Sequence, residues 1–267
     1  MSNSHQGHRA RKRFGQNFLH DENIIQRIIH SVNPKAGDNI VEIGPGLGAL
    51  TELLFEASDN INVVELDRDL VERLSKRFGE NKNFHIHSAD ALKFDFSSLA
   101  TKDKKLRVVG NLPYNISTPL LFHLMAQVDS VQDIHCMLQK EVVDRICAGA
   151  GENNYGRLSI MLQYYCQPQH LFNVPREAFQ PAPKVDSAIL RLTPHAQPPI
   201  TLKDEKLFAK LVAQAFSQRR KTLRNCIKTY LTAEQIESVG INPTARAETL
   251  TLEEFAKLSN IATAPQV

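Results

Sequence analysis

IVEIGPGLG, residues 40–48, is an apolar run that passes directly into three glycines at every second position. The run predicts a buried strand, and residues 49–57 after it have the apolar spacing of a helix. Glycine lets the backbone turn tightly and lets a ligand approach main-chain atoms that a Cβ would shield. A glycine-rich loop between a strand and a helix is typical of nucleotide-binding sites, so we expect a ligand site directly after this strand.

Strands and helices alternate around this loop. Apolar spacing predicts helices over 24–32, 69–78 and 157–165, and a further helix that Ser117 or Thr118 caps, with Pro119 in its first position. Strands are expected over 61–67, 84–89, 106–109, 134–138, 170–174 and 185–192. The alternation predicts a Rossmann-like α/β fold with a mostly parallel sheet, whose ligands bind beyond the carboxyl ends of the strands.

The C-terminal part of the chain has a different composition. Three prolines within 194–200 predict a linker. Beyond it, apolar residues over 207–230 recur at helical spacing, and capping-box sequences at 232–235 and 251–254 predict two shorter helices. We therefore expect a basic N-terminal arm over 1–20, an α/β domain over 21–193, the linker over 194–200 and a small all-α domain over 201–267.

Composition excludes several classes of protein. With 42% hydrophobic and 23% charged residues, the chain is close to an average globular protein. No apolar run approaches the roughly 18 residues that a membrane helix needs, and the Arg-rich start lacks the apolar segment of a secretory signal. The four cysteines show no Cys-x-x-Cys spacing, so neither a zinc site nor a disulfide framework is expected. We expect a cytoplasmic protein with no metal and no membrane contact.

Cations gather in two short segments although the formal net charge is only +3. Residues 1–20 contain no acidic residue and four basic ones, which are Arg9, Arg11, Lys12 and Arg13. The second cluster consists of Arg219, Arg220, Lys221, Arg224 and Lys228. A charge run is often only a solvated face, but like charges at this density repel one another unless anions such as RNA phosphates are bound. We therefore predict RNA contacts for Arg11, Lys12, Arg13, Arg219, Arg220, Lys221 and Arg224.

Carboxylates lie at the ends of the second and third predicted strands. Glu65 lies 21 positions after Gly44, where a carboxylate can accept hydrogen bonds from ribose hydroxyls. Asp90 is placed to accept from an adenine amino group, although an Asp at a strand end is also a common helix cap. Glu42, just before the glycines, favours a cationic ligand over a pyrophosphate, which indicates S-adenosylmethionine. The alternative is a nicotinamide dehydrogenase, which would bind a dinucleotide tightly.

GNLPY, residues 110–114, follows the fourth predicted strand. An exocyclic adenine amine is a weak nucleophile because its lone pair is delocalised into the ring. The side-chain oxygen of Asn111 and the backbone carbonyl of Leu112 could each accept one N6 hydrogen and favour a pyramidal nitrogen. Pro113 holds Leu112 extended, and Tyr114 can stack on the base. Alone, the motif is equally compatible with an Asn-capped turn; together with the glycine loop it favours a methyltransferase.

Further motifs make the sequence recognisable. They are RKRFGQNFL (11–19), EIGPGLG (42–48), GNLPYNIS (110–117), LQKEVVDR (138–145), YGRLS (155–159), PKVDSA (183–188) and QRRKTLRN (218–225). Over about residues 7–248 the chain closely resembles the KsgA family of ribosomal RNA small-subunit dimethyladenosine transferases. The resemblance implies transfer of four methyl groups from S-adenosylmethionine to N6 of two adjacent adenosines. These adenosines would lie in a hairpin near the 3′ end of the rRNA of an assembling small subunit.

The resemblance also implies roles for individual residues. Cofactor contacts are implied for Asn17, Leu19, Gly44, Glu65, Asp90 and Asn111. Asn17 and Leu19 would close the N-terminal arm over the cofactor, and Asn111 would join the cofactor and acceptor sites. The catalytic group would be Asn111, Leu112, Pro113, Tyr114 and Phe179. Within it, Phe179 would sandwich the target base against Tyr114.

Two other functions stay open. An enzyme of the macrolide-resistance type would dimethylate a large-subunit rRNA adenine, but the match along the whole chain, QRRKTLRN included, favours the small subunit. A ribosome-assembly factor would act mainly by binding, although the presence of Asn111, Tyr114 and Glu65 favours retained activity. We expect a monomer whose catalysis needs no metal.

Overall fold

The computed structural model describes residues 4–5, 8–9, 11 and 15–263, so Lys12 and Arg13 lie outside the described residues. The chain divides into two compact units. The first unit is Met1–Val143 with Gln169–Pro194, and the second unit is Asp144–Pro168 with His195–Val267. The sequence predicts a single division at a linker over 194–200. The structure also groups residues 144–168 with the C-terminal part, which was not predicted from the sequence.

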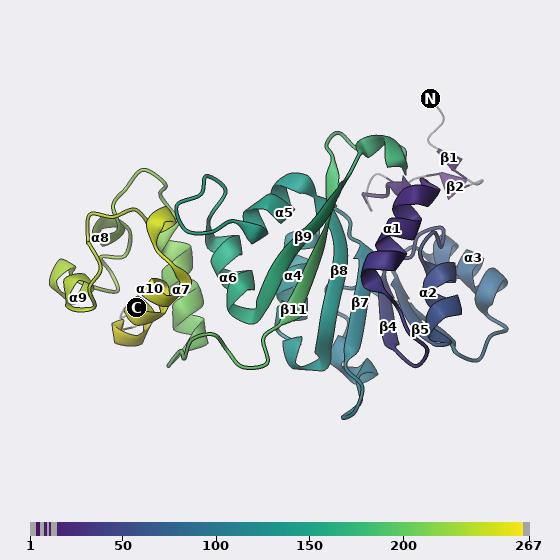
Figure 1. Ribbon diagram of the computed structural model, residues 1–267, viewed down its shortest axis with the longest axis horizontal. Helices are drawn as coiled ribbons and strands as arrows, with labels where there is room; N and C mark the ends of the chain where they lie inside the picture. The colour runs from purple at the N-terminus through teal and green to yellow at the C-terminus, as the bar shows by residue number, and fades with distance from the viewer. Residues whose placement is uncertain (1–3, 6–7, 10, 12–14, 264–267) are drawn as a thin grey trace. The chain divides into compact units, whose positions relative to one another are not determined.

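A seven-stranded sheet has the strand order β6-β5-β4-β7-β8-β11-β9. Figure 1 shows β5, β4, β7 and β8 side by side in this order. Its strands are β4 (Asn39–Ile43), β5 (Ile61–Glu65), β6 (Phe84–Ser88), β7 (Leu106–Asn111), β8 (Val131–Gln139), β9 (Cys166–Val174) and β11 (Ser187–Pro194). The strands from β6 to β8 are parallel, and β11 is antiparallel to β8. The predicted α/β fold with a mostly parallel sheet is confirmed. Strand order reverses beside β4, between β5 and β7, which is where ligands bind in such sheets.

The helices of the α/β part are α1 (Glu22–Val32), α2 (Thr51–Ser58), α3 (Arg68–Phe78) and α4 (Ser117–Met125). Helix α5 (Lys140–Cys147) begins in the first unit, and its residues from Asp144 belong to the second. Apolar residues at helical spacing on α1, such as Ile24 and Ile28, join Leu54 of α2 and Ile40 and Val63 of the sheet in one buried cluster. Burial of such side chains is the main stabilisation of the sheet, worth about 1.5 to 3 kcal/mol for each one fully buried.

Two local predictions differ from the structure. The cap of α4 is Ile116, and Ser117 is its first helical residue, because the Ser117 hydroxyl donates to the carbonyl of Tyr114 at 3.2 Å instead of capping the helix. Pro119 is therefore the third helical residue, still within the first turn, where no intrahelical N–H bond is lost. Helix α5 was not predicted, because it begins at Lys140 directly after β8, with no turn residue between them.

The second unit contains α6 (Arg157–Tyr165), α7 (Glu205–Ala215), α8 (Leu223–Cys226), α9 (Ala233–Ser238) and α10 (Leu252–Ile261). Both predicted capping boxes are present: Thr232 caps α9 and Thr251 caps α10, each with reciprocal hydrogen bonds to the third helical residue. Phe208 of α7 and Phe255 of α10 are fully buried in this unit. Packing of these helices on one another gives the unit its own core.

The apolar stripe over 207–230 is not one continuous helix. Helix α7 ends at Ala215, and α8 begins only at Leu223. The backbone N–H of Leu223 donates to Ala245 O at 2.8 Å, and that of Arg224 donates to Pro243 O at 3.0 Å. These bonds to a distant segment hold the chain out of the helix, so the cations at 219–221 lie in the turn between α7 and α8.

Candidate active site

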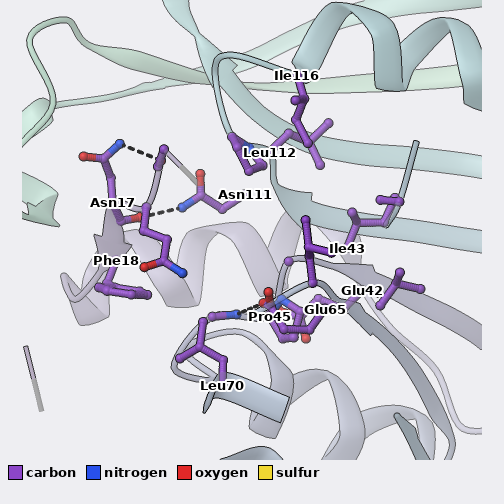
Figure 2. Close-up of a pocket in the computed structure, with 18 of the residues that line it drawn as sticks. Asn17, Phe18, Glu42, Ile43, Pro45, Glu65, Leu70, Asn111, Leu112 and Ile116 are labelled. Atoms are coloured by element: carbon purple, nitrogen blue, oxygen red, sulfur yellow. Dashed lines mark hydrogen bonds between the residues drawn. The ribbon is translucent and has the colours of Figure 1, made fainter. Parts of the chain in front are cut away.

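A cavity of about 240 Å³ lies beyond the carboxyl ends of the parallel strands (Figure 2). The glycine loop after β4, the end of β5, the segment after β6, the segment after β7 and residues 15–19 of the N-terminal arm line it. Both Glu65 and Asn111 are among the lining residues, with Asp90, Gly44 and Tyr114. The structure thus brings residues from four strand ends into one cavity.

The glycine loop has the backbone conformation that its sequence predicts. Gly44, Gly46 and Gly48 have φ values of 66°, 60° and 88°, in the left-handed region that side chains disfavour. A Cβ on Gly46 would lie 3.3 Å from the ring of Phe18, which lines the same cavity. The loop therefore needs glycine both for its turn and for the close approach of the N-terminal arm.

Glu65 is the last residue of β5 and is only 8% exposed. Its Oε1 accepts from the backbone N–H of Asp67 at 2.8 Å, and its Oε2 accepts from that of Gly46 at 3.4 Å. Burial raises the pKa of Glu65, and the neighbouring charge of Asp67 adds to this effect. Two backbone donors thus hold the carboxylate beside the glycine loop, with further acceptor capacity toward the cavity.

Glu42 lies one strand away on β4 and is 2% exposed. Burial raises its pKa to about 8, and the nearby charge of Glu65 acts in the same direction. The neighbouring hydroxyl of Thr51 acts against these two effects and lowers the pKa in part, but among the described residues no hydrogen bond of ordinary geometry reaches the Oε2 of Glu42. A buried carboxyl oxygen without a partner is costly, so this acid is a site where a cationic or hydrogen-donating ligand would be stabilised.

Asp90 follows β6 and lines the cavity. Its Oδ1 accepts from the backbone N–H of Leu92 at 3.0 Å, and its backbone carbonyl accepts from Lys93 at 2.9 Å. The turn-capping role that the sequence left open is therefore present. Because a carboxylate has two oxygens, the turn does not use up its acceptor capacity.

Asn111 is the last residue of β7. In the sheet, β7 and β5 lie on opposite sides of β4, so Asn111 and Glu65 flank the glycine loop. Its Nδ2 donates to the backbone carbonyl of Asn17 at 3.0 Å, and Figure 2 shows the two residues side by side. This bond engages the side-chain nitrogen of Asn111, so its side-chain oxygen stays available to accept a hydrogen bond from a ligand. The amide is thus held by the N-terminal arm in a defined orientation.

The rest of the GNLPY motif is fixed by the strands around it. A Cβ on Gly110 would lie 2.6 Å from the carbonyl oxygen of Ile43, so only glycine fits where β7 passes β4. The hydroxyl of Tyr114 forms a hydrogen bond of 2.7 Å with that of Ser187 at the start of β11. Burial raises the pKa of Tyr114. Leu112 is buried and its N–H donates to Met137 O, whereas Pro113 and Tyr114 are half-buried beside the cavity.

The N-terminal arm closes one side of the cavity. Phe18 and Leu19 form β3 (Phe18–Leu19), which pairs antiparallel with β10 (Phe179–Gln180). Asn17 and Leu19, both predicted to close over the cofactor, line the cavity. A second pair of short strands, β1 (Ser4–His5) and β2 (His8–Arg9), lies nearer the start of the arm.

Not every predicted site residue reaches the cavity. Phe179 is 1% exposed, belongs to the buried apolar cluster and is not among the lining residues, because pairing of β10 with β3 turns its ring into the core. In this conformation its ring offers no open face opposite Tyr114. Arg11, predicted to contact RNA, forms ion pairs with Asp67 and Asp69. Arg219, Arg220, Lys221 and Arg224 are exposed, and all belong to the second unit.

Two residues of the site, Asp67 and Ser187, were not predicted, and Gln16 was predicted only as part of the segment that closes over the cofactor. Gln16 lines the cavity, Asp67 holds both Arg11 and Gln16, and Ser187 bonds Tyr114. Gln16 and Ser187 lie within the motifs RKRFGQNFL and PKVDSA, so the motifs were the available indication. No motif indicated a role for Asp67 in the site, and its position fits the cap of α3 that the structure shows.

Comparison with known proteins identifies the family. The family model described as ribosomal RNA adenine dimethylase matches residues 7–264. The chain belongs to this family. Ribosomal RNA small subunit methyltransferase A of Acinetobacter baylyi is 58% identical over 255 residues, which cover 96% of this chain and 93% of that protein. The resemblance inferred from the motifs is confirmed, and so is the classification as a ribosomal RNA methyltransferase.

Solved structures agree with this family. A crystal structure of a dimethyladenosine transferase from Plasmodium falciparum matches with a TM-score of 0.76 and 26% identity, covering 92% of this chain and 99% of that chain. The crystal structure of the 23S rRNA methyltransferase ErmE matches with a TM-score of 0.71 at 22% identity, covering 91% of this chain and 98% of that one. At that identity, the likeness to ErmE concerns the fold alone.

Neither a membrane-spanning helix nor a cluster of metal ligands is present among the described residues. Within residues 15–263 and the short pieces before them, no helix combines the length and the apolar character needed to cross a membrane. In the same part of the chain, no three His, Cys, Asp or Glu side chains are grouped so that they could hold a metal ion.

Proposed function

We propose that this member of the family transfers methyl groups from S-adenosylmethionine to N6 of two adjacent adenosines in a hairpin near the 3′ end of small-subunit rRNA. The observation that carries the proposal is that Glu65 and Asn111 line the same cavity. A pocket suited to the adenosine part of a methyl donor thus adjoins a side chain suited to orient an acceptor amine. The name of the Acinetobacter baylyi relative supports the small subunit as the source of the acceptor.

The residues present fit S-adenosylmethionine. The left-handed glycines leave room at the loop, Glu65 and Asp90 offer acceptors for ribose and adenine, and Glu42 Oε2 is a buried acceptor without a partner. A positive ligand beside Glu42 would favour the ionised carboxylate and lower its raised pKa. When bound, S-adenosylmethionine would supply an activated methyl group.

The chain's own residues would prepare the acceptor. The side-chain oxygen of Asn111, whose amide nitrogen is held by Asn17, would accept one N6 hydrogen, and the carbonyl of Leu112 would accept the other. Both contacts favour a pyramidal nitrogen with a localised lone pair. Tyr114, anchored through Ser187, would stack on the unpaired base. The methylated nitrogen is acidic enough to lose its proton to water, so positioning is the main contribution of the protein.

Further parts of the proposal concern the RNA contacts, the oligomeric state and a second stacking face. Arg219, Arg220, Lys221 and Arg224 would bind rRNA phosphates of an assembling small subunit, and the enzyme would act as a monomer without a metal. Lys12 and Arg13 are proposed RNA contacts on sequence alone. Phe179 would serve as a second stacking face only if β10 rearranged, because its ring is now buried.

A direct test uses small and large ribosomal subunits from a strain that lacks the activity. The purified protein is incubated with each subunit and labelled S-adenosylmethionine, and the modified nucleotides are mapped by mass spectrometry. We expect two adjacent dimethyladenosines near the 3′ end of the small-subunit rRNA. Label that entered only the large subunit would overturn the proposed substrate.

Replacing Asn111 tests the acceptor site. Asn111→Ala should remove about 2 to 4 kcal/mol of transition-state stabilisation, a loss of roughly 30-fold to 1,000-fold in kcat. Affinity for S-adenosylhomocysteine, measured by calorimetry, should change much less. Asn83→Ala, at an exposed position before β6, is the matched control and should keep full turnover. An Asn111→Ala protein with unchanged kcat would exclude this role.

A further inference from the structure

Asp67 lies two residues after Glu65, and its side chain is fully buried. Its Oδ1 accepts from Nη1 of Arg11 at 2.6 Å, and its Oδ2 accepts from Nε2 of Gln16 at 2.9 Å. Its backbone N–H donates to Oε1 of Glu65 at 2.8 Å. One residue therefore contacts both the N-terminal arm and the carboxylate proposed to bind ribose.

Hydrogen bonds and one packing contact fix the arm at several residues. The backbone N–H of Arg11 donates to Oε1 of Gln16 at 2.8 Å, so these two residues and Asp67 form one closed hydrogen-bonded set. Further along, the carbonyl of Asn17 accepts from Asn111, and Phe18 lies against Gly46. Residues 15–19 thus cross the cavity from the Asp67 side to the Asn111 side.

We propose that Asp67 is a positioning residue which, through Arg11 and Gln16, holds the N-terminal arm closed over the cofactor and must release Arg11 when the cofactor exchanges. The proposal rests on the proposed function, because it assigns cofactor binding to this cavity. It also gives Arg11 a task at the cofactor site in place of the RNA contact predicted from its charge.

The electrostatics of the pair favour the closed arm. Arg11 is 33% exposed, whereas the Asp67 carboxylate is fully buried and lies close to the buried Glu65. Removing the cation would leave a buried carboxylate without its counter-charge. This destabilises a protein strongly, whereas breaking an exposed ion pair changes its stability little. The second partner of Arg11, Asp69, is 59% exposed at the start of α3, so it offers the guanidinium a position nearer to solvent.

The test measures binding and release of S-adenosylhomocysteine by the full-length protein. Arg11→Ala should weaken the affinity at least tenfold by calorimetry and accelerate dissociation in stopped-flow displacement. Arg11→Lys, which keeps the charge, should recover most of the affinity. Gln16→Ala should act in the same direction as Arg11→Ala, and it tests the set without removing a charge, because Gln16 contributes only a neutral hydrogen bond to the Asp67 carboxylate. Arg176→Ala, which removes an exposed ion pair with Glu177, is the matched control and should bind normally.

A second measurement separates the arm from RNA binding. The affinity of Arg11→Ala for small-subunit rRNA should equal that of the wild type. Unchanged affinity and dissociation rate for S-adenosylhomocysteine in both Arg11→Ala and Gln16→Ala would overturn the proposal, as would weakened RNA binding with intact cofactor binding. If the wild type itself did not bind S-adenosylhomocysteine, the proposed function would fail instead, which is a distinguishable result.

Discussion

Glu42 is a buried acid whose pKa is raised to about 8 by burial. Between pH 5 and pH 8 the folded protein keeps a proton on this carboxyl group that the unfolded chain releases, so its contribution to stability falls as the pH rises. Glutamine cannot ionise, so the stability of Glu42→Gln does not fall in this way. We predict that the unfolding free energy of Glu42→Gln, minus that of the wild type, is about 2 to 4 kcal/mol larger at pH 8 than at pH 5. Urea unfolding at pH 5 and pH 8, without added ligand, measures the difference.

The comparison with wild type is needed because His135 changes stability in the opposite sense. Burial lowers its pKa to about 4, so its contribution rises with pH up to the ordinary value of 6.5. Glu56→Gln, on the exposed side of α2, is the matched control and should give the same difference from wild type at both pH values. A Glu42→Gln difference that is independent of pH would contradict the prediction.

At the scale of elements, the two-residue strand β10 decides the environment of Phe179. Because β10 pairs with β3, the ring is packed in the core, and Phe179→Ala should cost about 3 to 5 kcal/mol of unfolding free energy. Phe179→Leu keeps an apolar side chain and should fold, so its methylation rate tests stacking separately from stability. Phe84→Leu, in the same buried cluster, is the matched control. Equal rates for the two Leu variants would mean that Phe179 acts in packing only.

At the scale of the whole molecule, charge is distributed unevenly, and four exposed cations lie within 219–224 of the second unit. If they bind phosphates, each Ala substitution should weaken binding of small-subunit rRNA and reduce the slope of log K against log salt by roughly 0.7 to 1. Titrations at several salt concentrations measure this slope. Lys102→Ala, an exposed cation in the first unit, should leave it unchanged. Unchanged slopes for all four variants would exclude these contacts.

Local patterns determined most of the elements and much of the cavity. The apolar spacing of α1, the glycine loop after β4 and the capping boxes of α9 and α10 each depend on residues within a few positions of one another. Such short-range interactions can be recognised in any single sequence. The predicted parallel order then brought the strand ends that carry Glu65 and Asn111 to the same edge.

Contacts between distant segments decided the rest. The break after α7 depends on Ala245 and Pro243, and the burial of Phe179 depends on its pairing with Leu19. The pairing of Arg11 with Asp67 likewise joins residues 56 positions apart. A sequence alone showed cations, an aromatic ring and apolar spacing; only the folded chain supplied their partners, because burial and hydrogen-bond geometry are properties of the tertiary arrangement.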